Sequence, residues 1–130
     1  MNTKLLLGAS ALVMGAAGVA ALFAPQELLT AFGIAPSSSL PLLVQLLAAM
    51  LFAFAMVNWT AKGSLIGGIY NRPVALGNLT HFAIGAITLL KFVTRTHATP
   101  AIVITTAVYV VFAIGFTLLF FRSPVAAPAS

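Results

Sequence analysis

The stretch that decides the fold is residues 40–59, LPLLVQLLAAMLFAFAMVNW, which holds no charged side chain. A helix that crosses the hydrocarbon core of a membrane, roughly 30 Å thick, needs about 20 mostly apolar residues. Three further stretches of this kind lie at about 5–23, 73–93 and 101–121, and proline or polar residues mark their ends. The sequence therefore predicts an all-α integral membrane four-helix bundle, in which residues 1–130 form a single transmembrane domain.

The composition excludes other classes of protein. Of the 130 residues, 62% are hydrophobic and 5% are charged, whereas soluble domains carry roughly 25% charged residues. So few charges cannot keep so much apolar surface in water, and a disordered chain would have low hydrophobicity and high charge. The net charge of +5 comes from six basic residues scattered singly along the sequence. This scatter argues against nucleic acid as a partner.

The first apolar stretch has two interpretations. Lys4 followed by Leu5, Leu6 and Leu7 is also typical of a cleaved signal peptide, and small residues lie downstream. The apolar run of 19 residues is long for a signal peptide. We therefore favour a helix that stays in the membrane.

Basic residues in the short loops predict the orientation, because Lys and Arg are enriched in cytoplasmic loops. If the N-terminus is cytoplasmic, four basic residues lie on that side and two on the other. The four are Lys4, Lys62, Arg72 and Arg122, and the two are Lys91 and Arg95. We therefore expect both termini in the cytoplasm.

The first connection, residues 25–36, has the sequence PQELLTAFGIAP. Leu28, Leu29 and Phe32 fall near one side of a short helix that prolines bound, and the single acid of the chain, Glu27, lies in the same segment. This pattern predicts an amphipathic helix that lies at the outer membrane interface.

One face of the stretch 73–93 carries polar residues that are candidates for a function. Asn78, His81 and Gly85 share this face, and His81 lies roughly 10 Å into the membrane at about 1.5 Å per residue. Both ring nitrogens of a neutral imidazole need partners in hydrocarbon, so this face should point to another helix. Two roles stay open for His81: handling a ligand or a proton, or the packing hydrogen bond that we favour.

A candidate ligand site combines this face with polar residues at the ends of the second and third spans. The proposed contacts are Asn58, Trp59, Arg72, Asn78 and His81, which could line a pocket for an anionic or amphipathic molecule. The alternative is simpler, because Trp is common at membrane interfaces and Arg on the cytoplasmic side. We favour this alternative, in which the residues have ordinary positions at the membrane interface and bind no ligand.

Small residues predict close packing of helices. Ala11 and Gly15 are four positions apart in the first span, and Gly85 lies on the polar face of the third. Such residues let two helix backbones approach each other closely in a membrane. Gln45, a polar residue inside the second span, is expected to form a packing hydrogen bond.

The residue types missing from the spans exclude most chemistry. The chain has no Cys, its one acid lies outside the spans, and His81 is the one histidine inside a span. Thiol chemistry, a haem held by two histidines, a metal site and a Ser–His–acid triad therefore lack the residues that they need. We expect no catalytic residue, no metal, no cofactor and no enzymatic activity.

Three segments carry a resemblance to a known family. They are LFAPQELLTAFGIAP, LLAAMLFAFAMVNW and IYNRPVALGNLTHFAIGAITLLK, at residues 22–36, 46–59 and 69–91. In these segments the chain resembles the small four-span bacterial membrane proteins grouped as DoxX-like. The resemblance implies a four-helix bundle of the bacterial inner membrane, with some relatives linked to quinone-dependent respiratory complexes. It transfers no catalytic residue to this chain.

Two functions are compatible with these patterns. The first is that of a non-enzymatic protein: an accessory or structural subunit of a larger membrane complex, or a homo-oligomer. The alternative is the binding or transport of a lipid, a quinone or a similar amphipathic molecule in an intramembrane pocket near His81. The expected partners are membrane lipids and other membrane subunits or copies of this chain.

Overall fold

The computed structural model describes residues 2–35, 37–63 and 72–122, and in these residues all regular structure is helical. The helices are α1 (Thr3–Phe23), α2 (Pro25–Ala31), α3 (Leu40–Ala61), α4 (Arg72–Val93) and α5 (Pro100–Arg122). All but α2 are long and apolar enough to cross a membrane. The predicted fold class, four membrane-spanning helices with a short helix after the first, is confirmed. The predicted bounds of the four spans differ from those observed by at most two residues at any end.

The helix starts follow from local chemistry. Asn2 caps α1, because its side-chain oxygen accepts a hydrogen bond from the Leu5 backbone N–H at 3.2 Å. Pro25, Pro41 and Pro100 stand in the first two positions of α2, α3 and α5. Backbone N–H groups at these positions have no partner within the helix, so proline is tolerated there and its fixed φ favours the helix.

The short helix α2 turns the chain between α1 and α3. It ends in a turn at Gly33, whose φ of +71° falls in the left-handed region that favours glycine. In this turn the Ile34 N–H donates to the Leu29 carbonyl at 2.9 Å. Leu29 is buried and Glu27 is exposed. The helix thus has an inward apolar side and an outward acid, as an interfacial helix requires.

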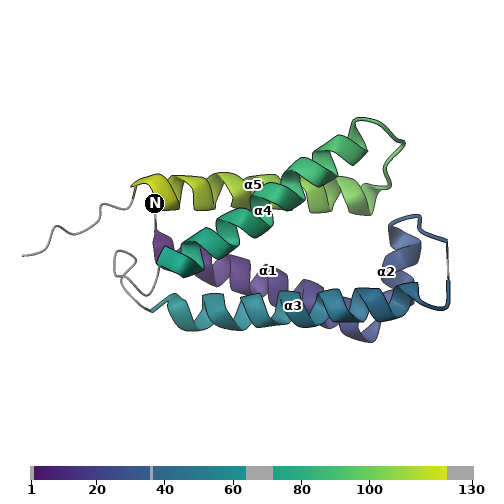
Figure 1. Cartoon of the computed structure of the whole chain (residues 1–130), viewed down its shortest axis with the longest axis horizontal. Coiled ribbons are helices and arrows are strands. Elements are labelled where there is room, and N and C mark those ends of the chain that lie inside the picture. Colours follow the sequence, from purple (N-terminus) through teal and green to yellow (C-terminus); the bar gives the residue numbers. More distant parts are fainter. Residues whose placement is uncertain (1, 36, 64–71, 123–130) are drawn as a thin grey trace, which may run out of the picture.

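The four long helices lie as two antiparallel pairs, α1 with α3 and α4 with α5 (Figure 1). In the first pair the backbones approach closely at Gly18, where an added Cβ would lie 3.1 Å from the Ala48 carbonyl oxygen. Gly15 faces Ala55, and Ala11 is buried. Gln45 donates to the Leu22 carbonyl at 3.2 Å, which confirms the predicted packing hydrogen bond.

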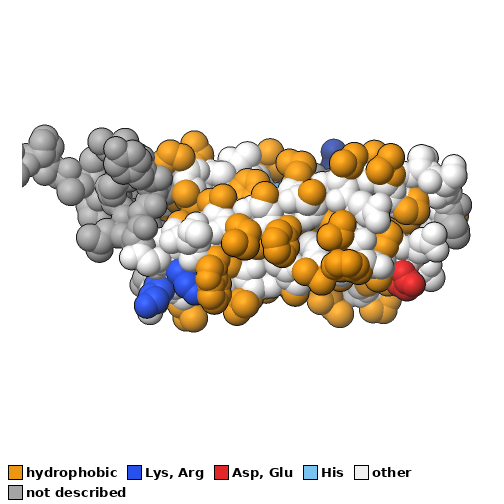
Figure 2. All heavy atoms as spheres, turned by 90° about the horizontal axis from the view of Figure 1, so that it is seen from below, with side chains coloured by type: hydrophobic (Ala, Val, Ile, Leu, Met, Phe, Trp, Pro, Cys, Tyr) orange, Lys and Arg blue, Asp and Glu red, His pale blue; other side chains and the backbone are white. Residues whose placement is uncertain are grey.

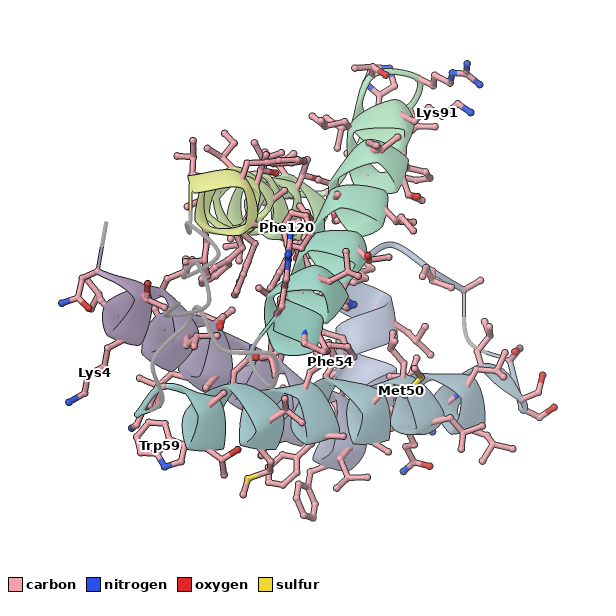
Figure 3. The ribbon with its side chains drawn as sticks, turned by 60° about the vertical axis from the view of Figure 1, so that its left-hand side comes forward. Lys4, Met50, Phe54, Trp59, Lys91 and Phe120 are labelled. Carbon is pink, nitrogen blue, oxygen red and sulfur yellow. The ribbon has the colours of Figure 1, made fainter. Side chains whose placement is uncertain are left out.

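The two pairs meet at the end where α1 begins and α5 finishes, and α4 crosses away from α3 toward the end that holds α2 (Figure 1). The core where they meet includes an aromatic stack on α4 and α5, in which the Phe82 ring centroid lies 4.9 Å from that of Phe112 and 5.6 Å from that of Phe116. Farther along α3, Phe54 and Met50 both point toward the α4 side (Figure 3), yet Met50 is 63% exposed. The helix pairs therefore pack together at one end, whereas at the other end the halves touch through their connections, where a Cβ on Gly33 would lie 3.1 Å from Thr99 Cγ2.

Candidate functional site

A buried pair of asparagines joins α3 to α4. Asn58 Nδ2 donates to Asn78 Oδ1 at 2.7 Å, and Asn78 Nδ2 donates to Asn58 Oδ1 at 2.6 Å. Both side chains are completely buried. Because hydrocarbon offers no other partners, each amide depends on the opposite one.

Ser10 extends this pair to α1. Asn58 Nδ2 also donates to Ser10 Oγ at 3.0 Å, and the Ser10 hydroxyl donates to the Leu7 carbonyl at 3.0 Å. The remaining donor of Asn78 reaches the Val74 carbonyl at 2.9 Å. We call Ser10, Asn58 and Asn78 the polar trio; it links three helices at the joined end of the molecule.

The polar trio leaves no donor for a ligand. Every side-chain N–H of Asn58 and Asn78 has a partner, and the described residues contain no buried side-chain nitrogen or oxygen without one. The structure thus brings together these two proposed ligand contacts, but pairs them with each other. A ligand would have to displace one of these hydrogen bonds.

His81 lies in the middle of α4, where it contacts both neighbouring helices. Its Nε2 is 3.1 Å from the hydroxyl of Tyr109 on α5. On the other side, the ring of Phe54 from α3 stacks on the imidazole with a centroid distance of 5.5 Å and an interplanar angle of 24°. The imidazole therefore bridges the two helix pairs.

Two glycines make room for the rings beside His81. A Cβ on Gly77 would lie 3.4 Å from Cε1 of Phe54, and a Cβ on Gly85 would clash with the ring carbons of Tyr109. These glycines stand four residues before and four residues after His81, on the same face of α4. We call Phe54, Gly77, His81, Gly85 and Tyr109 the His81 cluster.

The second ring nitrogen of His81 is open to the surroundings. Nδ1 has no hydrogen-bond partner among the described residues. None of their unpartnered side-chain polar atoms is buried, so Nδ1 reaches the surface of the chain within the membrane span. An unpaired polar atom at this depth is unfavourable in lipid. Nδ1 of His81 is therefore the atom of this cluster at which another molecule could form a hydrogen bond.

Trp59 and Arg72 lie apart from this cluster. Trp59 is about half exposed on α3, and the Lys62 ammonium lies 2.7 Å from the centroid of its ring. Arg72 starts α4, and its guanidinium carbon lies 5.5 Å from the ring centroid of Phe120. His81 stands nine positions after Arg72, which is about 14 Å along a helix. The five proposed ligand contacts are therefore not brought together in one group. Asn58 and Asn78 belong to the polar trio and His81 to its own cluster, whereas Trp59 contacts Lys62 and Arg72 contacts Phe120.

Sequence reasoning underrated Tyr109 and Phe54, the partners of His81. Tyr109 falls on a stripe of α5 with Thr105, which suggests only packing. The available signal was on α4, where Gly77 and Gly85 flank His81 at a spacing of four. Such spacing indicates that large side chains of other helices fill the space beside the imidazole.

Comparisons with known proteins add no relative: no protein-family model, curated protein or solved structure matches the chain. The DoxX-like resemblance stays a prediction. The candidate sites are thus defined by their geometry alone.

Proposed function

We propose that this protein is a non-enzymatic membrane subunit that works by assembling with other membrane spans, in a larger complex or with copies of itself. The observation that supports this is an apolar groove of about 460 Å³ between α1 and α3. Its lining consists of Gly18, Val19, Leu22, Phe23, Ala48, Ala49, Phe52 and Ala53.

The groove suits a helix of a partner. Two small residues of its lining, Ala49 and Ala53, are exposed on α3. Small residues let a second backbone approach closely, which drives association in lipid where the hydrophobic effect is absent. Val19 and Phe52 are about half exposed and flank this small-residue surface. Helix α3 buries only a narrow stripe of its residues within the chain, so most of its surface is free for such contacts.

Filling the groove tests this proposal. Ala53→Leu should weaken assembly by occupying the groove, whereas Ala107→Leu on the exposed side of α5 should have no effect. The measurement is the particle mass of each variant after purification in a mild detergent, with identification of any copurified protein. A wild-type particle that is strictly monomeric and carries no partner would overturn the proposal.

A second candidate function is the binding of an amphipathic small molecule, such as a lipid or a quinone, at the His81 cluster. The open Nδ1 of His81 favours it, because a hydroxyl or carbonyl of such a molecule would supply the missing hydrogen bond. The side of α3 next to Phe54 is accessible at Met50, and on α4 the neighbouring Ile84 is 61% exposed.

Extraction and mass spectrometry of copurified small molecules test this candidate. His81→Phe keeps an aromatic ring against Phe54 but removes both nitrogens, so the bound molecule should be lost. His97→Phe, in the exposed connection before α5, is the matched control and should keep it. Unchanged small-molecule content in His81→Phe would rule out this site.

For localisation, we propose an orientation in the bacterial inner membrane with both termini in the cytoplasm. Helix α1 begins and α5 ends at the same end of the molecule (Figure 1), and Lys4, Lys62 and Arg72 belong to that end by their places in the chain. Enrichment of Lys and Arg on the cytoplasmic side supports this direction. Reporter fusions to the N-terminus that are active only in the cytoplasm test it, and activity outside would reverse it.

A further inference from the structure

Lys62 folds back from the end of α3 onto the seam between α3 and α1. Its ammonium lies over the ring of Trp59, 2.7 Å from the centroid. Its aliphatic chain runs toward α1, since a Cβ on Gly8 would lie 4.0 Å from Lys62 Cδ. The cation–π contact and this packing hold the charge beside the seam instead of letting it extend freely.

Lys4 brings a second ammonium group to the same seam. It precedes Gly8 by four residues, so the two share a face of α1, and that face is the one that Lys62 approaches. Lys4 is exposed. Lys4 and Trp59 lie at the same end of the α1–α3 pair (Figure 3), and basic side chains gather at one end of this face of the molecule (Figure 2).

The acidic side chain of this sequence lies far from these two charges. Its single acid is Glu27, which belongs to α2 at the far end of the α1–α3 pair, where Figure 2 shows the acidic side chain. No other Asp or Glu exists in the sequence. No acidic side chain of the sequence is therefore placed to pair with Lys4 or Lys62. At the depth of an interfacial tryptophan, the abundant anions are the phosphates of lipid headgroups.

We propose that Lys4, Lys62 and Trp59 form a binding site for the headgroup of an anionic phospholipid. The two ammonium groups donate hydrogen bonds to the phosphate oxygens, and the acyl chains lie along the exposed apolar side chains of α1 and α3, such as Leu12 and Met56. A zwitterionic lipid fits less well, because its own ammonium group opposes the second lysine. This site is separate from the groove and from the His81 cluster. The lipid-site proposal therefore does not depend on whether the protein assembles with other membrane spans.

Trp59 makes this site directly observable, since it is the only tryptophan in the chain. The protein is reconstituted in bilayers of phosphatidylcholine and phosphatidylglycerol, in which one of the two lipids is brominated on acyl carbons close to the headgroup. Bromine quenches only tryptophans that it approaches. The ratio of quenching by the brominated anionic lipid to quenching by the brominated zwitterionic lipid, at equal mole fraction, reports the preference of the site.

In the wild type we expect the quenching ratio to favour the anionic lipid, with each of the two lysines contributing a factor of about five. Lys4→Gln and Lys62→Gln should each lower this ratio about fivefold. Lys91→Gln in the last turn of α4 and Arg95→Gln in the connection to α5 remove basic residues at the opposite end of the chain's spans and should leave it unchanged. Because Lys62 touches Trp59, the ratio within each variant is compared rather than the total intensity, and circular dichroism checks that each variant is folded.

Three results would overturn the proposal, two of them in the quenching ratios. The first is equal quenching by both lipids in the folded wild type, and the second is an unchanged ratio in both Lys4→Gln and Lys62→Gln. Inorganic phosphate at millimolar concentration, compared with chloride at equal ionic strength, should not relieve the quenching. If it does, the site takes free phosphate and the assignment to a lipid is wrong.

Discussion

The side-chain amides of Asn58 and Asn78 hydrogen-bond to each other in both directions, with N···O distances of 2.7 and 2.6 Å. The two residues belong to different helix pairs, so this reciprocal contact joins the α1–α3 pair to the α4–α5 pair. It lies in a completely buried position, where neither amide can turn to water. Loss of one amide therefore affects the other as well.

Replacement of either asparagine should destabilise the protein. Asn58→Leu and Asn78→Leu are similar in size to the wild type, but each leaves the opposite amide without its partner, at a cost of about 1–3 kcal/mol in the free energy of unfolding. The double variant removes both amides and should cost less than the sum of the single changes. Unfolding by sodium dodecyl sulfate in mixed micelles, followed by circular dichroism, measures this. Thr80→Leu, at an exposed position of α4, is the control; additive effects would contradict the pairing.

The hydrogen bond between His81 and Tyr109 should contribute less to the free energy of unfolding than the packing of the two rings does. Tyr109→Phe keeps the ring beside Gly85 and removes only the hydroxyl, so we expect a loss of about 1 kcal/mol. His81→Phe combined with Tyr109→Phe completes a double-mutant cycle, whose coupling free energy isolates the hydrogen bond. Both are measured by the same unfolding assay. A coupling free energy of zero would mean that the two groups do not interact in the membrane.

The two glycines beside His81 should respond differently to a methyl group. Gly85→Ala places a Cβ into the ring of Tyr109 and should destabilise the protein by about 1–3 kcal/mol, as overpacking does. Gly77→Ala brings its Cβ only to an ordinary contact with Phe54, at 3.4 Å, and should be close to neutral. Thermal unfolding in detergent compares the two variants. Equal melting temperatures would contradict the close contact between Gly85 on α4 and Tyr109 on α5.

A similar comparison tests the contact between α1 and α3. At Gly18 an added Cβ would meet backbone atoms of α3, the Ala48 carbonyl oxygen at 3.1 Å and the Phe52 nitrogen at 3.2 Å, which cannot move independently. At Gly15 it would meet only the Cβ of Ala55 at 3.6 Å. We expect Gly18→Ala to lower stability by about 1 kcal/mol or more, and Gly15→Ala to be tolerated. Greater damage from Gly15→Ala would contradict this packing.

The spans were predictable because length and composition alone decide them. Apolar runs of about 20 residues match the thickness of a bilayer, and prolines such as Pro41 and Pro100 stand where a helix can begin. Predicted and observed ends agree within one or two residues for this reason. The short helix α2 followed from the same kind of local signal, prolines around an amphipathic segment.

The partners of each helix were not predictable, because apolar residues lie on all sides of each span and its few polar residues do not identify the helix that they face. A stripe of apolar residues marks the buried face of a helix in water, but in a membrane it does not. Asn58 and Asn78 were therefore predicted to contact a ligand in a shared pocket, although they bind each other. In the same way, nothing in the sequence places Lys62 over Trp59, because the side-chain direction depends on how α3 ends beside α1.

Each of the two helix pairs joins spans that follow each other in the chain: first α1 and α3, then α4 and α5. During synthesis, the first hairpin can therefore form as soon as α3 has entered the bilayer, before the second half of the chain exists. The second hairpin forms by the same local route, and local contacts fold quickly. The Asn58–Asn78 pair, the His81 cluster and the packing of α1 against α5 have to wait for both halves. The biogenesis of the protein thus divides into two insertions followed by one docking step. A substitution that breaks the Asn58–Asn78 pair should affect this docking step and leave the two insertions unchanged.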